Sequence, residues 1–133
     1  MPYSDLLWND FWEDLNILAV DDEKAVTTTI KVVLIRSGHS VDALNSGQEA
    51  MEKIKESPNQ YQILITDHLM PGVTGIQLLH LLKPVAFKGK IIVLSAHLTL
   101  ELKDNYTALG VDRIIDKPFD VDELRTAVEQ LKN

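Results

Sequence analysis

The chain has 133 residues, of which 45% are apolar and 25% charged, a composition typical of one globular domain with its own core. Its net charge of −7, with thirteen Lys and Arg residues scattered along the sequence, argues against direct binding to nucleic acid. The absence of cysteine excludes disulfides and thiolate metal sites, and no apolar run approaches the roughly 18 residues that span a bilayer, so we expect a cytoplasmic protein without a membrane partner.

Four large apolar residues recur at the spacing of a helix within residues 1–15. They are Trp8, Phe11, Trp12 and Leu15. Most acidic residues of this segment fall on the other face, which predicts an amphipathic helical extension ahead of a domain that covers 16–133. An isolated helix this short is marginal in water, so we expect it to dock on its own domain or on a second copy of the chain. The alternative is an unstructured tail.

From residue 16 onward, short apolar runs alternate with helix-like segments. Strands are expected at 16–20, 40–44, 62–66, 90–94 and 113–116, and helices at 23–37, 47–56, 76–82, 98–109 and 120–132. This alternation predicts an α/β fold in which five helices cover both faces of a doubly wound, five-stranded parallel sheet. Sites in such sheets lie at the carboxyl ends of the strands, where the strand order reverses.

Polar side chains stand where the expected strands end. Asp21 and Asp22 follow the first strand, Asp67 the third, Ser95 the fourth and Lys117 the fifth. Carboxylates brought so close repel one another, and Mg²⁺ relieves this repulsion because it takes oxygen ligands and usually sits beside a phosphate. The pattern therefore predicts a cation site in which Asp67 is either a third ligand or a nucleophile that accepts a phosphoryl group.

Each of these residues also has an ordinary structural explanation. The acids after the first strand could begin a helix, and Asp67 could belong to a turn. Ser95 and Lys117 could be polar groups of exposed loops. The meeting of all of them at one edge of the sheet favours a functional site.

Four stretches resemble the receiver domain of two-component response regulators. They are "ILAVDDE", "ILITDHLMPGVTG", "IIVLSA" and "DKPF", in the order and at the spacing of that family, and they lie between residue 16 and the C-terminus. The resemblance implies a flavodoxin-like fold with strand order 2-1-3-4-5. It also implies a signalling phosphoacceptor rather than an enzyme, limited to self-catalysed phosphotransfer and dephosphorylation. Its partners would be a sensor histidine kinase or phosphotransfer protein and a downstream target, and a homodimer stays open.

The resemblance assigns roles by position. Asp67 resembles the phosphoacceptor, while Ser95 and Lys117 resemble the hydroxyl and the lysine that contact the phosphoryl group. The Lys117–Pro118 peptide bond is usually cis in this family, and the free-energy cost of a cis bond is small only before proline.

The same resemblance implies the ligands of Mg²⁺. Asp22 resembles the direct metal ligand, and Asp21 the acid that acts largely through water. Asp67 and the backbone carbonyl of Leu69 would complete the set.

The sequence departs from the family at the position three residues before Lys117. The family often has Tyr or Phe there, a side chain that swings inward on phosphorylation, whereas this chain has Ile114. We therefore expect the signal to pass through Ser95 and the segment 96–109. Leu69 and His97 occupy variable positions that tune the lifetime of the acyl phosphate in the family. None of the four histidines has metal-ligand spacing, and we interpret them as solvated or structural.

Three other functions fit the sequence less well. A flavin carrier needs a phosphate cradle after the first strand, where Asp21 and Asp22 would repel the phosphate. A phosphohydrolase with an aspartate nucleophile typically needs a second acid two residues later, where this chain has Leu69. A receiver that acts only as a scaffold, without phosphorylation, does not require the complete set of polar residues that this chain carries.

Overall fold

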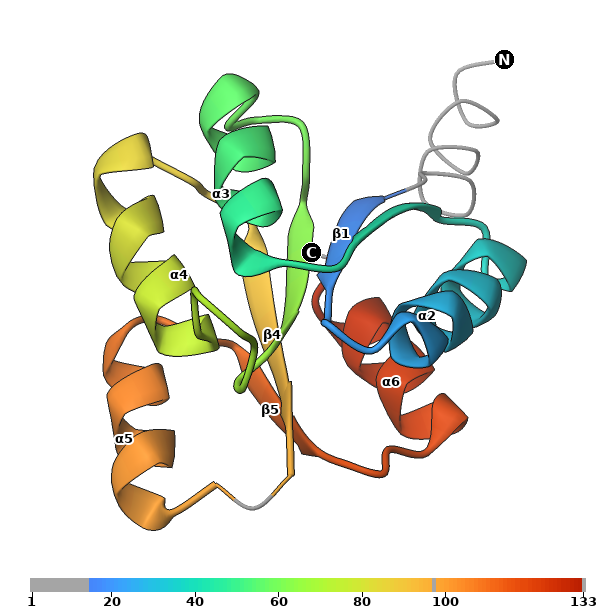
Figure 1. The fold of residues 1–133 in the computed structure, drawn as a ribbon. Helices are drawn as coiled ribbons and strands as arrows, with labels where there is room; N and C mark the ends of the chain where they lie inside the picture. Colours follow the sequence, from blue (N-terminus) through green and yellow to red (C-terminus); the bar gives the residue numbers. More distant parts are fainter. Residues whose placement is uncertain (1–14, 97, 133) are drawn as a thin grey trace.

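The computed structural model describes residues 15–96 and 98–132, which form a central sheet with helices on both sides (Figure 1). Apart from Leu15, the helix predicted over 1–15 lies outside the described residues, and so does His97. Leu15 is not helical: it is buried in the core, and its carbonyl accepts a hydrogen bond from the Ser40 amide at 2.9 Å. The predicted helix therefore does not reach this residue.

The five strands are parallel and follow the order β2-β1-β3-β4-β5, which confirms the predicted fold class. Their bounds are β1 Asn16–Val20, β2 Ser40–Leu44, β3 Ile63–Asp67, β4 Lys90–Ser95 and β5 Arg113–Asp116. Side chains alternate between the two faces, so that Ile17 and Ala19 join one core cluster while Leu18 and Val20 join the other. Burial on both faces explains why the inner strands read as continuous apolar runs.

Helices cover both faces of this sheet (Figure 1). One face packs against α2 Lys24–Arg36 and α6 Val121–Gln130, and the other against α3 Gly47–Glu56, α4 Gly75–Leu82 and α5 Leu100–Ala108. The sequence did not predict η1 Lys83–Val85, a 3-10 turn after α4 that contains Pro84, a residue with no amide to continue the α-helical bonding. Within the described residues, no helix has the length and apolar character needed to cross a membrane.

Side-chain caps shift two helix starts from the predicted positions. The Thr99 hydroxyl accepts a hydrogen bond from the Leu102 amide at 3.1 Å, so α5 begins one residue after Thr99. The Asp120 carboxylate likewise accepts from the Asp122 amide at 2.7 Å at the start of α6. Both helices are therefore shorter than their apolar patterns predict.

Two strands extend one residue further than predicted. Asp67 is the last residue of β3, where it pairs with Leu94, and Ser95 is the last residue of β4, where it pairs with Asp116. Backbone pairing therefore fixes these two candidate site residues directly, with no intervening loop.

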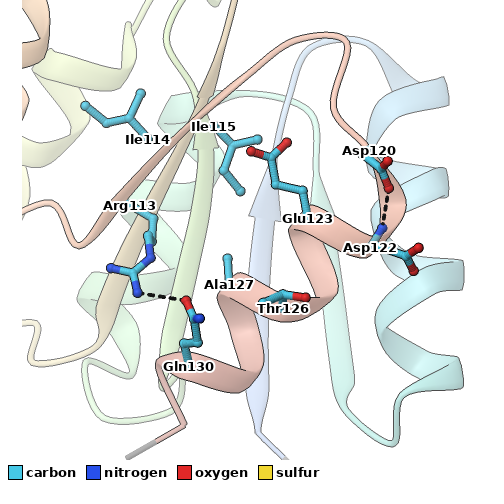
Figure 2. Close-up of a pocket in the computed structure, with 9 residues that line it drawn as sticks. All are labelled: Arg113, Ile114, Ile115, Asp120, Asp122, Glu123, Thr126, Ala127 and Gln130. Atoms are coloured by element: carbon cyan, nitrogen blue, oxygen red, sulfur yellow. Dashed lines mark hydrogen bonds between the residues drawn. The ribbon is translucent and has the colours of Figure 1, made fainter.

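The edge strand β5 is held against α6, as Figure 2 shows. The Arg113 guanidinium donates a hydrogen bond to the Gln130 side chain at 2.9 Å. Ile115 points toward α6 and joins its core cluster, whereas Ile114 points to the opposite face and packs with the other cluster. The position where the family often has an aromatic residue thus belongs to the layer of α3, α4 and α5.

A groove lies at the amino ends of β1, β3 and β4. It is lined by both ends of the described chain, namely Leu15 at one end and Leu131 and Lys132 at the other. The sites predicted from the sequence lie at the opposite edge of the sheet.

Candidate phosphoacceptor and metal site

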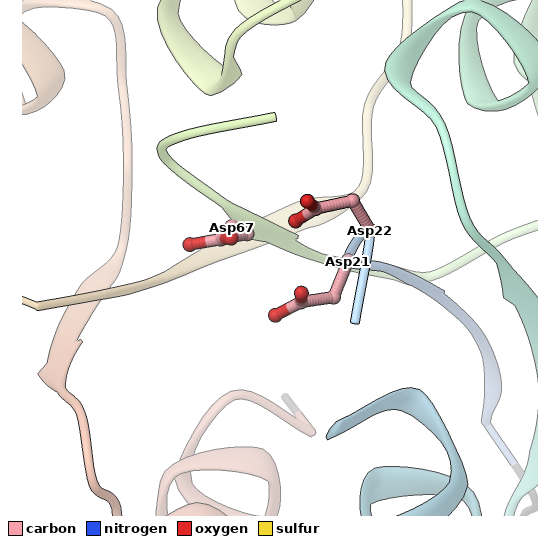
Figure 3. A group of neighbouring side chains, drawn as sticks. All are labelled: Asp21, Asp22 and Asp67. Atoms are coloured by element: carbon pink, nitrogen blue, oxygen red, sulfur yellow. The ribbon is translucent and has the colours of Figure 1, made fainter. Parts of the chain in front are cut away.

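Three carboxylates meet at the carboxyl edge of the sheet, where β1 and β3 end (Figure 3). Asp21, Asp22 and Asp67 each place an oxygen within 4.8 Å of an oxygen of the other two. Asp21 is fully buried and Asp67 is 7% exposed, whereas Asp22 is open to solvent. The cluster could hold a hard divalent cation, because such ions take carboxylate oxygens and keep several waters on their open side.

The ammonium group of Lys117 lies between the two buried carboxylates. Its Nζ is 2.7 Å from Asp21 Oδ2 and 3.3 Å from Asp67 Oδ1. The Glu23 amide donates to the other oxygen of Asp21 at 2.9 Å, so both oxygens of that buried carboxylate have a partner. Residues 96 positions apart in the chain thus form one ion-paired unit.

The charge balance of this unit shifts the pKa of two groups. Burial raises the pKa of Asp67 above its usual value, and the charge of Asp21 raises it further. Lys117 and the His68 amide, which donates to Asp67 Oδ1 at 2.8 Å, oppose this rise. Burial alone would lower the pKa of Lys117, but its contacts with Asp21 and Asp67 outweigh burial, so the pKa of Lys117 is raised.

Ser95 and Leu69 occupy the same edge of the sheet. Ser95 is buried, and its hydroxyl donates to the neighbouring Ala96 carbonyl at 3.3 Å rather than to the carboxylates. Its own carbonyl accepts from the Lys117 amide at 2.9 Å, just before the Lys117–Pro118 bond, which is cis as the resemblance implies. Leu69 lies two residues after Asp67 in the loop to α4, with its side chain 67% exposed.

A polar pair that the sequence did not predict lies behind Asp67. The Tyr106 hydroxyl on α5 makes a short hydrogen bond to Nδ1 of His68, the residue after Asp67. Burial raises the pKa of Tyr106 and lowers the pKa of His68, which favours the neutral form of both partners in this hydrogen bond. Tyr106 is fully buried although α5 shows little amphipathic pattern, and a pair 38 residues apart leaves no local signal in the sequence.

Gly75, the first residue of α4, allows these groups to approach one another. Its amide donates to the His68 carbonyl at 2.8 Å. A Cβ at this position would lie 2.6 Å from both the Asp67 carbonyl oxygen and the Tyr106 hydroxyl. Only glycine fits here without displacing the backbone that carries Asp67.

The doubly wound parallel sheet, with acids and a lysine at its carboxyl edge, defines a class of α/β signalling domains built on the flavodoxin-like fold. The family model of the response regulator receiver domain matches residues 17–129, and the chain belongs to this family.

Comparisons with individual proteins agree with this assignment. The transcriptional regulatory protein DltR of Streptococcus agalactiae is 32% identical over 110 residues, which cover 83% of this chain and 48% of DltR. The sporulation initiation phosphotransferase F of Bacillus subtilis is 29% identical over 115 residues, which cover 86% of this chain and 90% of that protein. The chain spans about half the length of several curated relatives that it matches.

A solved structure shows the same arrangement. The receiver domain of a Francisella response regulator superposes with a TM-score of 0.80 at 30% identity, covering 89% of this chain and 96% of that one. The resemblance stated from the sequence is thereby confirmed at the level of family and fold.

Replacing Asp67 should change how stability depends on pH when no metal is bound. Because the folded-state pKa of Asp67 is raised, its contribution to stability is present at low pH and is lost as pH rises from about 4 through the raised value. In a chelator, Asp67→Asn should therefore melt at a higher temperature than the parent at about pH 8, with a smaller difference at about pH 5. The exposed Asp116, at the end of β5, provides the control Asp116→Asn, which should follow the parent. An Asp67→Asn variant less stable than the parent at the higher pH would contradict this electrostatic account.

Gly75→Ala should destabilise the fold by about 1–3 kcal/mol, because the added Cβ meets a backbone oxygen that cannot move aside. Gly89→Ala is the matched comparison, since its nearest obstacle is the side-chain ring of Phe87, which can rotate. Urea unfolding of both variants measures the difference. Equal losses would show that the loop around Gly75 relaxes more easily than its contacts indicate.

Proposed function

We propose that Asp67 is the phosphoacceptor of this receiver domain and that Lys117 and Ser95 stabilise the phosphoryl group on it. The supporting observation is the position of Asp67 at the end of a central strand: its Oδ1 is 3.3 Å from Lys117 Nζ, and one of its carboxylate oxygens lies within 4.8 Å of an oxygen of each acid that follows β1. A carboxylate nucleophile attacking a phosphoryl group needs nearby positive charge, since such catalysis is mostly positioning and charge compensation.

In the proposed reaction, a carboxylate oxygen of Asp67 attacks the phosphorus of a phosphohistidine on a sensor histidine kinase or phosphotransfer protein. A P–O bond forms to Asp67 while the P–N bond breaks, and the imidazole nitrogen keeps the electron pair and takes up a proton. Lys117 then neutralises one phosphoryl oxygen, and the Ser95 hydroxyl turns from Ala96 to donate to another. Attack of water on the acyl phosphate returns the free carboxylate and inorganic phosphate.

The residues that would hold Mg²⁺ are Asp21, Asp22 and Asp67, together with the backbone carbonyl of Leu69. The donor set fits this ion because it consists of oxygen alone and includes the exposed Asp22, beside which water ligands have room. Bound there, Mg²⁺ would supply positive charge to offset the phosphoryl oxygens.

We propose that phosphorylation changes the surface of the domain and that a downstream target binds the changed surface. This target could also be a second copy of the chain, in which case a homodimer forms. DltR, which this chain resembles over about half of that protein's length, is a transcriptional regulatory protein. The net charge of this chain is −7, which disfavours direct contact with the phosphate backbone of nucleic acid. We therefore propose that the downstream target is a protein.

The first test is phosphorylation by a small donor. With Mg²⁺ and acetyl phosphate, the parent should gain the mass of one phosphoryl group in a form that is labile to base, because an acyl phosphate is a mixed anhydride that hydroxide cleaves. Asp67→Asn should gain none, whereas the control Asp116→Asn should react as the parent does. Intact-mass measurement decides the outcome. Equal modification of Asp67→Asn would refute the assignment, and a folded parent that never reacts would favour the scaffold function.

The second test concerns the metal. Mg²⁺ should raise the melting temperature of the parent by mass action, with about 2.7 kcal/mol expected at a hundred times the dissociation constant. Asp22→Asn should be more stable than the parent in chelator, because it removes one of three clustered charges, and should gain much less from Mg²⁺. Asp21→Asn should instead be less stable in chelator, since Asp21 is the closest partner of Lys117. Identical gains from Mg²⁺ in the parent and in Asp22→Asn would place the ion elsewhere.

A further inference from the structure

The helix α5 contributes one buried side chain to the domain. Of its nine residues only Tyr106 is buried, and it is fully buried. Its ring lies edge-on to the His68 ring, with centroids 5.4 Å apart and planes at 81°, and its hydroxyl bonds to His68 Nδ1. The anchor of α5 is therefore the residue that immediately follows Asp67.

Three contacts from three directions fix His68. Its amide donates to Asp67 Oδ1 at 2.8 Å, and its carbonyl accepts from the Gly75 amide at 2.8 Å. Its ring is held by the Tyr106 hydroxyl. Because Gly75 has no side chain, the Tyr106 hydroxyl and the Asp67 carbonyl can both lie close to its Cα, and a Cβ there would be 2.6 Å from each.

We infer that Tyr106 is a positioning residue for the phosphorylation of Asp67, acting through His68, and that the same contact carries the phosphorylated state to α5. This inference rests on the proposed function of Asp67. The oxygen that the His68 amide binds belongs to the carboxylate that reacts, so the orientation of the nucleophile depends on where His68 is held. Once Asp67 carries a phosphoryl group, its carboxylate oxygens take new partners, and the His68 amide must adjust.

The residues around α5 are compatible with coupling from Asp67 through His68 and Tyr106 to this helix. Ile114 offers no hydroxyl and no aromatic ring to follow a movement of Ser95. No second residue of α5 is buried, although Leu98 and Leu109, which flank the helix, pack partly buried against the same core cluster. A helix anchored at a single buried polar contact responds to that contact as a unit.

The chain contains a matched control for a purely structural hydrogen bond. Tyr61 is also almost fully buried in the same core cluster, and its hydroxyl bonds to the Asp42 side chain on β2. Neither Tyr61 nor Asp42 contacts the acidic cluster in the described residues. Tyr61→Phe and Tyr106→Phe each remove one hydroxyl from a buried ring, but only the second lies behind the nucleophile.

The experiment measures phosphorylation of the full chain by acetyl phosphate at saturating Mg²⁺, over a range of donor concentrations. Tyr106→Phe should lower the maximal rate about threefold to tenfold with an unchanged half-saturating donor concentration, because orientation rather than donor binding is lost. Tyr61→Phe should leave both values unchanged. Parental rates in Tyr106→Phe would overturn the positioning role, and an equal loss in Tyr61→Phe would show a general effect of weakened packing.

Substitutions at His68 provide a second, independent readout. His68→Leu should slow the reaction as Tyr106→Phe does, and the double variant should be no slower than either single one, since both changes break the same contact. His68→Gln, whose amide can still form a hydrogen bond with the Tyr106 hydroxyl, should recover most of the rate. Strictly additive losses would overturn the inference, and this comparison remains decisive if Tyr106→Phe folds poorly.

The coupling to α5 is tested with beryllofluoride, which stands in for the phosphoryl group on Asp67. Hydrogen exchange of the amides in residues 100–108 should change when beryllofluoride binds to the parent or to Tyr61→Phe, and should not change in Tyr106→Phe. A retained response in Tyr106→Phe would exclude this route. A parent that neither reacts with acetyl phosphate nor responds to beryllofluoride would instead refute the proposed function of Asp67, so the two failures are distinguishable.

Discussion

The contact of the Lys117 ammonium with two buried carboxylates is the interaction on which the rest of this edge of the sheet depends. Asp21 and Asp67 lie almost out of contact with water, where two negative charges side by side are costly. The lysine, 2.7 Å from one and 3.3 Å from the other, makes their burial tolerable. Backbone amides also bind these carboxylates: the Glu23 amide donates to Asp21, and the His68 amide donates to Asp67. A substitution in this unit should therefore change both the reactivity of the site and the stability of the fold.

Much of this arrangement could be predicted from the sequence, because apolar runs and their polar ends are local patterns. The strands, their parallel order and the meeting of Asp21, Asp22 and Asp67 followed from those patterns and from the family resemblance. Helix starts were less accurate, since a cap such as Thr99 overrides the apolar periodicity that continues past it. The contact between His68 and Tyr106 was not predictable, because α5 shows little amphipathic pattern and the contact joins distant parts of the chain.

The acidic cluster is destabilising by itself, but it lies at the end of a well-buried strand. Clustered acids destabilise the metal-free edge of the sheet, while the central strand that carries Asp67 is buried along its whole length. The strands hold the acids in place, and α5, with one buried residue, covers the same face of the sheet as α3 and α4 (Figure 1). Because the strands are buried and α5 has only one buried residue, a change of charge at Asp67 would move α5 at the surface more readily than it would disturb the core.

The groove shared by Leu15, Leu131 and Lys132 has a consequence for how the domain can be joined to other polypeptides. Both ends of the described chain lie at the amino edge of the sheet, while the carboxylates lie at the carboxyl edge. A segment that leaves the domain at Leu15 or at Lys132 thus starts on the side remote from the three carboxylates. The closeness of Leu15 to Lys132 suits circular permutation of the described domain, in which a short linker joins these two residues and new termini are opened in an exposed loop.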